Sequence, residues 1–492
     1  MRRIGGMIVA KIDVEVLIVG AGISGLSLAC WLQKLAPNRG FEIFEARDSV
    51  GGTWDLFRYP GIRSDSEMFT LGFAFKPWRD DDAIASGDKI MDYLHETIDE
   101  FDLESKIRLR HKVSSANWNS AEHFWEVEFN NNGGKMEKIR ARFLYMGTGY
   151  YDYEKPFDPE INGETKFCGQ LFHAQFWPEN LDYANKKVVV IGSGATALTV
   201  IPTMAKTAAS VTMLQRSPSY VFNRPKRDWF ANLMKRILPP KLAYEAARLK
   251  FTFMSRLMNN HVLKHPEEAR KRLMDLMKRD LPEGFDMRHF TPNYNVWDQR
   301  VCAAPDGDFF DAVKGGNVEV VTGNIKQISE DAIELESGEK IDTDIIIKAT
   351  GLNLIAGPKF AMSIDGQNVD ISKCIIYKGA MFSNVPNFAF VFGYLMASWT
   401  LKADLVARYF IRFIDEIEAK GAKSGTPKLD VNSITPVPMF NFSSGYITRS
   451  IDKLPKQTAN FPWTINQDYK VDKNIFLKMP IDDGVIEYGG RK

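Results

Sequence analysis

Cysteine is scarce in this 492-residue chain, and its most apolar stretch, residues 388–401, is too short and too glycine-interrupted to cross a bilayer. Cys30, Cys168, Cys302 and Cys374 are scattered and form no Cys-x-x-Cys pair. This spacing argues against a zinc site or a disulfide framework, so we expect no metal and a reducing, cytoplasmic environment. A net charge of +1 gives no electrostatic reason to expect nucleic acid as a partner.

The first glycine turn indicates a dinucleotide site. An apolar strand is expected over residues 14–19, and it runs into Gly20-Ala-Gly-Ile-Ser-Gly25 and then a helical pattern. Gly20 permits a tight turn, Gly22 lets the backbone approach a pyrophosphate, and Gly25 allows close packing of helix and strand. Glu45 follows twenty residues after Gly25, where a carboxylate accepts hydrogen bonds from ribose hydroxyls. The first unit therefore suits a cofactor with free ribose hydroxyls, such as FAD.

A second unit repeats this pattern about 170 residues later. The strand expected over 187–191 leads into Gly192-Ser-Gly-Ala-Thr-Ala197. At the position that corresponds to Glu45 stand Gln215 and Arg216. An arginine pairs with a 2′-phosphate that an acid would repel, so this unit favours NADPH over NADH. The alternative is that Arg216 is a surface arginine with no ligand.

Aromatic and small residues fill the segment between the two units. Gly51-Gly-Thr-Trp54 would let the chain pass close over a flavin ring, with Trp54 packed nearby. Asp65 follows in Tyr59-Pro-Gly-Ile-Arg-Ser-Asp65 and is either a turn-forming residue or a buried carboxylate that awaits a cation. Arg300 is a candidate partner for it, and the sequence leaves this pairing open.

Residues 224–280 read as amphipathic helices and hold 15 basic and 6 acidic residues. We favour a solvated basic face, with peripheral contact to an anionic membrane as the alternative.

At 492 residues the chain is too long for a single hydrophobic core. We expect an α/β fold with two Rossmann-like dinucleotide-binding domains and a helical insertion. The predicted segments are an FAD domain (1–155), an NADP domain preceded by a linker (156–222), the helical insertion (223–300), the rest of the NADP domain (301–351) and the returning FAD part with a C-terminal wrap (352–492). The tail beyond residue 425 is rich in proline and asparagine and is predicted to be an extended wrapping segment.

The string Phe-x-Gly-x3-His-x3-Trp-Pro over residues 167–178 resembles the fingerprint of the type I Baeyer–Villiger monooxygenases. The block from Gly51 to Asp65 resembles that family's second signature, and the likeness extends from about residue 14 to 470. The resemblance implies that His173 and Trp177 lie in a linker that governs domain motion more than bond chemistry. Gln299 departs from the lysine of many relatives, which implies a weaker NADPH preference.

The resemblance also implies roles for individual residues. FAD would be held by Gly20, Gly22, Ser24, Gly25, Glu45, Thr53, Trp54, Asp55, Leu56, Asp65 and Val113. NADPH would be held by Arg63, Ser64, Asp65, Gly192, Ser193, Gly194, Ala195, Thr196, Ala197, Leu198, Gln215 and Arg216. Arg300 would be the catalytic arginine, oriented by Asp65.

The implied reaction uses NADPH to reduce FAD and O2 to form a C4a-peroxyflavin, which turns ketones into esters or lactones and oxygenates sulfur in thioethers or thioamides. One alternative is a related enzyme that acts mainly on sulfur or nitrogen. A flavin disulfide reductase is disfavoured because it needs a redox cysteine pair. A non-catalytic membrane scaffold would bind anionic liposomes without NADPH turnover.

Overall fold

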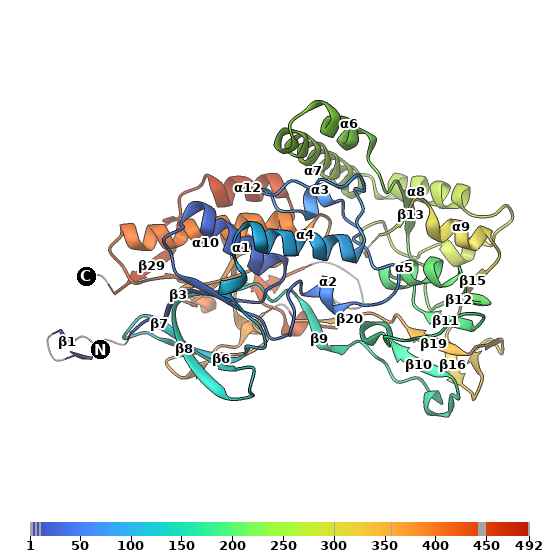
Figure 1. Cartoon of the computed structure of the whole chain (residues 1–492), viewed down its shortest axis with the longest axis horizontal. Coiled ribbons are helices and arrows are strands. Elements are labelled where there is room, and N and C mark those ends of the chain that lie inside the picture. Colours follow the sequence, from blue (N-terminus) through green and yellow to red (C-terminus); the bar gives the residue numbers. More distant parts are fainter. Residues whose placement is uncertain are drawn as a thin grey trace.

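The computed structural model describes residues 3–4, 7–8, 11–299, 301–355, 357–440 and 449–490. Two β-sheets lie beside each other, each flanked by helices, and both termini lie at the end occupied by the larger sheet (Figure 1). Each sheet contains a parallel strand that enters a glycine turn and then a helix. The predicted α/β fold with two Rossmann-like units is therefore confirmed.

The larger sheet joins parallel strands to an antiparallel meander. β3 (Val14–Val19) pairs in parallel with β4 (Phe41–Phe44) and with β8 (Met136–Met146). β8 then pairs antiparallel with β7 (Phe124–Asn130), and β7 with β6 (Lys112–Asn119). Nearly all of β3 is buried, which explains its almost unbroken apolar sequence. The other strands are β5 (Ile107–Arg108), β21 (Ala361–Ile364), β22 (Gln367–Asn368) and β25 (Phe388–Phe390).

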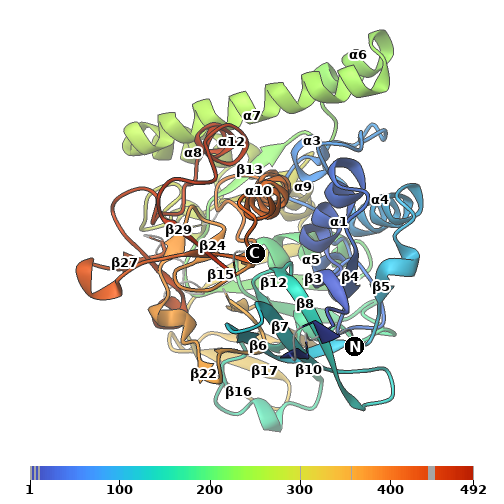
Figure 2. The same cartoon turned by 90° about the vertical axis from the view of Figure 1, so that its left-hand side faces the viewer.

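Helices from the two ends of the chain cover one face of this sheet. α1 (Ile23–Leu35) packs beside α10 (Trp399–Ala419), and α4 (Gly87–Glu100) adds to the same core (Figure 2). The opposite face buries Trp118 and Trp125 beneath segments that come mainly from beyond residue 354. The C-terminal part of the chain thus completes the domain that the N-terminal part begins.

The smaller sheet is entirely parallel. Its strands, in spatial order, are β10 (Gln170–His173), β19 (Ile345–Lys348), β11 (Lys187–Ile191), β12 (Ser210–Gln215) and β15 (Val318–Thr322). α5 (Ala195–Met204) and α9 (Asp308–Lys314) pack on one face of it. A small antiparallel sheet packs on the other. The strands of the antiparallel sheet are β16 (Ile325–Ile328), β17 (Ala332–Leu335) and β18 (Lys340–Asp342).

The chain passes between the two sheets through β9 (Tyr151–Pro156) and returns through β20 (Leu352–Leu354), which pair antiparallel. A second short connection pairs β13 (Val221–Arg224) with β14 (Cys302–Pro305) in parallel. The β9–β20 pair joins the two units, whereas β13 and β14 both pack in the core of the smaller sheet.

The described residues between β13 and β14 include three α-helices: α6 (Trp229–Ile237), α7 (Pro240–Lys264) and α8 (Pro266–Asp280). α7 spans 25 residues and lies along one edge of the molecule in both views (Figures 1 and 2). It is anchored by Arg248, which is buried and donates hydrogen bonds to the carbonyl oxygens of Phe69 and Gly72. Within the described residues, no helix has the length and apolar character needed to cross a membrane.

The C-terminal wrap is more structured than the expected extended segment, because it contains a helix. α12 (Tyr469–Leu477) begins after Asp468, whose carboxylate accepts hydrogen bonds from the N–H groups of Lys470 and Val471. The remaining short elements include α2 (Thr53–Leu56), α3 (Met68–Leu71), β23 (Ile376–Tyr377), β24 (Met381–Phe382), β26 (Ser424–Pro427), β27 (Val437–Pro438), β28 (Lys456–Gln457) and β29 (Ile486–Gly489).

Candidate functional site: two glycine turns and the loop between them

The first turn is built so closely that two of its positions admit only glycine. Gly20 has φ +101°, and a Cβ on it would lie 2.9 Å from the carbonyl oxygen of Gly147. A Cβ on Gly25 would lie 1.9 Å from the carbonyl oxygen of Gly20. α1 therefore starts directly against the end of β3, which is the close packing expected for this turn.

The second turn repeats this geometry. Gly192 has φ +140°, and a Cβ on it would lie 2.3 Å from the carbonyl oxygen of Ala349. Ala349 follows β19 in Ala-Thr-Gly, just as Gly147 follows β8 in Gly-Thr-Gly. The residues from Gly147 to Gly149 were missed at the sequence level, although their likeness to 349–351 was a usable signal. At Gly194 a Cβ would meet no atom of the described residues within 4 Å.

The helices that follow these turns begin without a protein anion. Neither α1 nor α5 has a side-chain cap, and neither carries an acidic residue in its first turn. Their first N–H groups and the positive end of each helix dipole are thus available to an external anion. α10 shares both properties, and its first residue, Trp399, donates its indole N–H to the hydroxyl oxygen of Ser24 on α1 at 2.7 Å.

Glu45 is buried beside the first turn. One carboxylate oxygen accepts the backbone N–H of Ala21 at 2.8 Å, and the other accepts that of Arg47 at 3.0 Å. Each carboxylate oxygen has a second acceptor position, so the group retains capacity for ribose hydroxyls. Tyr153 and Lys359 both lie near Glu45. The amine nitrogen of Lys359 is 4.2 Å from the centroid of the Tyr153 ring. Burial lowers the pKa of Lys359 to about 8.

The Gly51–Leu56 segment folds over the first turn. Gly52 lies against Gly22, and its carbonyl oxygen accepts a hydrogen bond from Arg47 at 3.1 Å. Arg47 also pairs with the buried carboxylate of Asp55 at 2.7 Å. The hydroxyl groups of Thr53 and Tyr153 are hydrogen-bonded at 3.0 Å. The other predicted FAD residues of this region are partly buried (Trp54, Leu56) or lie in the sheet core (Val113).

The loop from Tyr59 to Asp65 extends from the first unit and packs against helices of the second. Tyr59 is hydrogen-bonded to Thr196 at the start of α5, and burial raises its pKa to about 12. A Cβ on Gly61 would lie 2.4 Å from the hydroxyl oxygen of Thr203 on the same helix. Arg63 pairs with Asp308, the first residue of α9. The segment from Gly51 to Asp65 thus contacts both glycine turns.

Asp65, the predicted partner of Arg300, lies in this loop, and its backbone carbonyl oxygen accepts a hydrogen bond from Arg224 at 3.1 Å. Ser64 beside it is buried. Arg300 lies outside the described residues, so its pairing with Asp65 stays a prediction.

The residues that follow β12 differ in how they are placed. Gln215 is buried and donates its amide N–H to the carbonyl oxygen of His289 and to Thr322, whereas Arg216 is exposed. Arg449, which no sequence motif indicated, lies with its guanidinium 3.4 Å above the Phe157 ring. Burial and then the charge of Arg216 lower the pKa of Arg449. In the second turn, Ser193 contacts the hydroxyl group of Ser219 at 2.8 Å, and the remaining predicted NADPH residues, Ala195, Ala197 and Leu198, lie in α5.

The linker string forms part of the smaller sheet. His173 is the last residue of β10, is buried, and accepts the N–H of Gln175 on its ring nitrogen. Burial lowers its pKa. The Gln175 side chain donates to the carbonyl oxygens of Asp152 and Tyr153, both at 3.0 Å, and so fastens the linker to β9.

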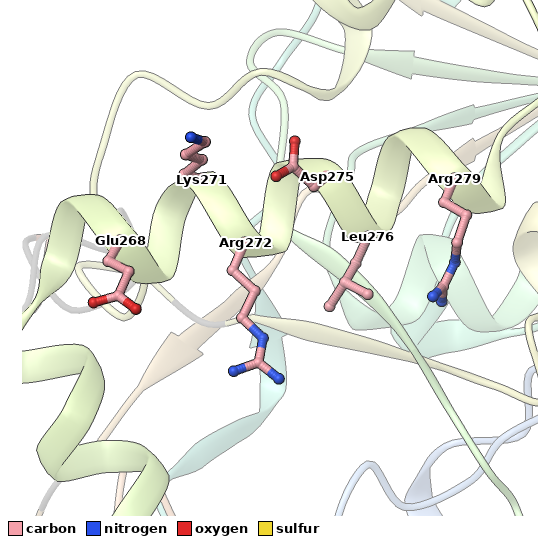
Figure 3. A pocket seen from close by; sticks show the side chains of 6 residues that line it. All are labelled: Glu268, Lys271, Arg272, Asp275, Leu276 and Arg279. Atoms are coloured by element: carbon pink, nitrogen blue, oxygen red, sulfur yellow. The ribbon is translucent and has the colours of Figure 1, made fainter.

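Two surface pockets lie elsewhere and contain no predicted site residue. One, of about 350 Å³, is lined by side chains of α8 alone (Figure 3): Glu268, Lys271, Arg272, Asp275, Leu276 and Arg279. The other, of about 410 Å³, lies where α7 and α12 meet. Side chains along one exposed helix do not converge on an enclosed space, as the polar groups of a binding pocket do. We therefore place the candidate site at the glycine turns.

Comparison with known proteins gives an independent view of the chain. The family model described as flavin-binding monooxygenase-like matches residues 13–417. The FAD-containing monooxygenase EthA of Mycobacterium tuberculosis (strain ATCC 25618 / H37Rv) is 44% identical over 479 residues, which cover 97% of this chain and 98% of that protein. The probable FAD-binding monooxygenase AlmA of Acinetobacter baylyi is 44% identical over 477 residues, 96% of each chain.

Solved structures share the fold. An oxidized steroid monooxygenase bound to NADP superposes with a TM-score of 0.76 at 21% identity, covering 97% of this chain and 99% of that one. A polycyclic ketone monooxygenase from Thermothelomyces thermophila superposes with a TM-score of 0.78 at 17% identity, covering 97% and 90%.

Proposed function

The chain belongs to the flavin-binding monooxygenase-like family, and on that premise we propose that it is an FAD-containing, NADPH-dependent monooxygenase of the type I Baeyer–Villiger class. Its proposed reaction places one oxygen atom of O2 into a ketone, giving an ester or lactone, and reduces the other to water at the expense of NADPH. The same enzyme is proposed to oxygenate sulfur in thioethers or thioamides.

The difference in charge between the two turns carries this proposal. The first turn is followed by the buried carboxylate of Glu45, which suits the free ribose hydroxyls of FAD. The second is followed by the exposed Arg216, with Arg449 as a second guanidinium nearby, which suits the 2′-phosphate of NADPH. We accordingly assign residues 1–155 and 352–492 to FAD, and 156–222 and 301–351 to NADPH.

The residues present fit these two cofactors. The uncapped starts of α1 and α5 would each receive a pyrophosphate, and the open space at Gly194 gives the second one room. Bound FAD, once reduced by NADPH, supplies the activated oxygen. The protein's own part is to orient the two cofactors and to exclude water, which the folding of Gly52 against Gly22 and the loop contacts of Tyr59 support.

The carbonyl oxygen of a ketone gains negative charge when the carbonyl carbon is attacked, so a positively charged side chain beside that oxygen stabilises the transition state. We propose that Arg300 stabilises that oxygen and that Asp65 orients the arginine. A donor of this kind contributes about 3 kcal/mol to the transition state. The runner-up function is oxygenation of sulfur or nitrogen with little activity on ketones.

The proposal is tested by product analysis with one ketone and one thioether, in the wild-type protein and in Arg300→Ala. We expect ester and sulfoxide from the wild type, and loss of the ester in the variant with its FAD content unchanged. Arg256→Ala, on the exposed side of α7, is the matched control. Persistence of the ester in Arg300→Ala would contradict the role of the arginine. Sulfoxide without ester from the wild type would favour the runner-up.

A further inference from the structure

α7 has two apolar faces, and only one of them is used by the fold. Ala243, Tyr244, Ala247 and Val262 are buried against the body of the protein. The opposite face carries exposed apolar side chains at helical spacing, which we call the apolar stripe: Leu242, Leu249, Phe253, Leu257 and Leu263.

The stripe is highly exposed. Leu249 is 71% exposed, Leu263 66% and Phe253 58%. Neighbouring α6 adds Trp229, at 74%, and Ile237, at 61%, spaced eight residues apart on one helix face. Large apolar side chains gathered in one place on a protein surface mark an interaction site, whereas single exposed ones do not.

Charge indicates what this surface contacts. Residues 224–280 hold 15 basic and 6 acidic residues, whereas the whole chain holds 63 and 62. Several of these bases are used in ion pairs, but six exposed ones form no ion pair with any described residue: Arg236, Lys241, Lys264, Lys271, Arg272 and Lys278. Arg236 lies on α6, Lys241 and Lys264 lie on α7, and the other three lie on α8. Exposed apolar side chains and unpaired cations on the same group of helices are the pattern of a surface that lies in the interface of an anionic bilayer.

The placement of the helices agrees with such contact. α6 and α7 lie at the outer edge of the molecule in two perpendicular views (Figures 1 and 2). α7 is held by Arg248 through its buried face, so the stripe is presented without unfolding the helix. A second copy of the chain fits this surface less well, because two such surfaces meeting face to face would bring two basic excesses together.

We propose that the apolar stripe and the unpaired cations of α6, α7 and α8 form a docking surface for an anionic phospholipid bilayer. α7 lies parallel to the bilayer plane, its leucines and Phe253 enter the headgroup boundary, and the basic residues contact lipid phosphates. This docking is independent of the oxygenation chemistry proposed above.

The test is co-sedimentation of the FAD-loaded protein with vesicles of phosphatidylcholine alone or mixed with phosphatidylglycerol. The apolar variant combines Leu249→Gln, Phe253→Gln and Leu257→Gln, which keep helix propensity. Its control, Leu35→Gln with Met136→Gln, changes exposed apolar residues elsewhere. The charge variant combines Lys264→Gln with Lys271→Gln, and its control Lys186→Gln with Lys206→Gln.

We expect binding to the mixed vesicles, weak binding to phosphatidylcholine alone, and an affinity for the mixed vesicles about tenfold lower in the apolar and charge variants. Both controls should bind like the wild type, and thermal melting should confirm that all variants are folded. Failure to sediment with the mixed vesicles, or full binding by the apolar variant, would overturn the proposal. So would sedimentation equilibrium that shows a dimer, split by the apolar variant, with no vesicle binding.

Discussion

Trp399 and Ser24 are 375 residues apart in the chain and are joined by a hydrogen bond of 2.7 Å between the indole N–H and the hydroxyl oxygen. The bond sets the start of α10 beside the start of α1. Because neither helix has a side-chain cap, two positive helix ends meet near the first glycine turn. The returning C-terminal part of the chain therefore contributes directly to the proposed FAD site.

Trp399→Phe is expected to weaken FAD binding without unfolding the protein. The change removes one hydrogen bond, worth about 1 kcal/mol, and so should raise the FAD dissociation constant about fivefold. Titration of the apoprotein followed by flavin fluorescence measures this constant. Trp229→Phe is the control, since Trp229 is exposed on α6 and far from either turn in sequence. An unchanged constant in Trp399→Phe would contradict the placement of α10 at the FAD site.

Gly192 and Gly194 are expected to respond differently to alanine. Gly192→Ala should destabilise the fold, because its φ is +140° and the new Cβ would lie 2.3 Å from the carbonyl oxygen of Ala349. Gly194→Ala should leave the melting temperature unchanged, since no described atom lies within 4 Å of the new Cβ. It should instead raise the KM for NADPH about tenfold by obstructing the pyrophosphate. Equal KM values for wild type and Gly194→Ala would argue against NADPH at this turn.

Two arginines of α7 offer a matched test of burial. Arg248 pairs with the buried Asp404 at 3.5 Å, whereas Arg256 pairs with the partly exposed Asp468 at 2.8 Å. Arg248→Met should lower the free energy of unfolding by about 3–5 kcal/mol, because it leaves the buried carboxylate of Asp404 without its ion-pair partner. Arg256→Met should lower it by less than about 1 kcal/mol. Urea denaturation measures both, and similar losses would show that Arg248 does not anchor the helix.

Lys359 is expected to make stability depend on pH. Burial lowers the pKa of this amine in the folded protein to about 8. Between that pH and the ordinary lysine value, the unfolded chain holds a proton that the folded protein has released, so stability rises with pH across this window. The free energy of unfolding of the wild type should therefore increase relative to that of Lys359→Met between pH 8 and pH 10. Lys373→Met, at an exposed position, should show no such trend. A difference that is flat or falls with pH would contradict the buried amine.

Local patterns in the sequence predicted the parts of the site that are formed by neighbouring residues. The two glycine turns are of this kind, since strand, turn and helix follow one another within about twenty residues and Gly20 and Gly192 need backbone angles that other residues avoid. The basic helices of 224–280 were equally visible from their periodicity.

Contacts between distant segments left no such pattern. Nothing in the sequence links Tyr59 to Thr196, Trp399 to Ser24, or Arg449 to the residues after β12. These contacts arise from tertiary packing, where any polar residue of suitable length can be a partner. The helix α12 was missed for a related reason, because the surrounding prolines and asparagines suggested an extended chain.

The most direct test of the proposed function is the fate of the oxygen atoms of O2. Purified FAD-loaded protein is mixed with NADPH, ¹⁸O2 and either a ketone or a thioether, and the products and H2O2 are quantified against NADPH consumed. The account predicts one ¹⁸O atom in the ester or sulfoxide for each NADPH oxidised, with little H2O2. NADPH oxidation that yields only H2O2 and no labelled product from either compound would contradict it.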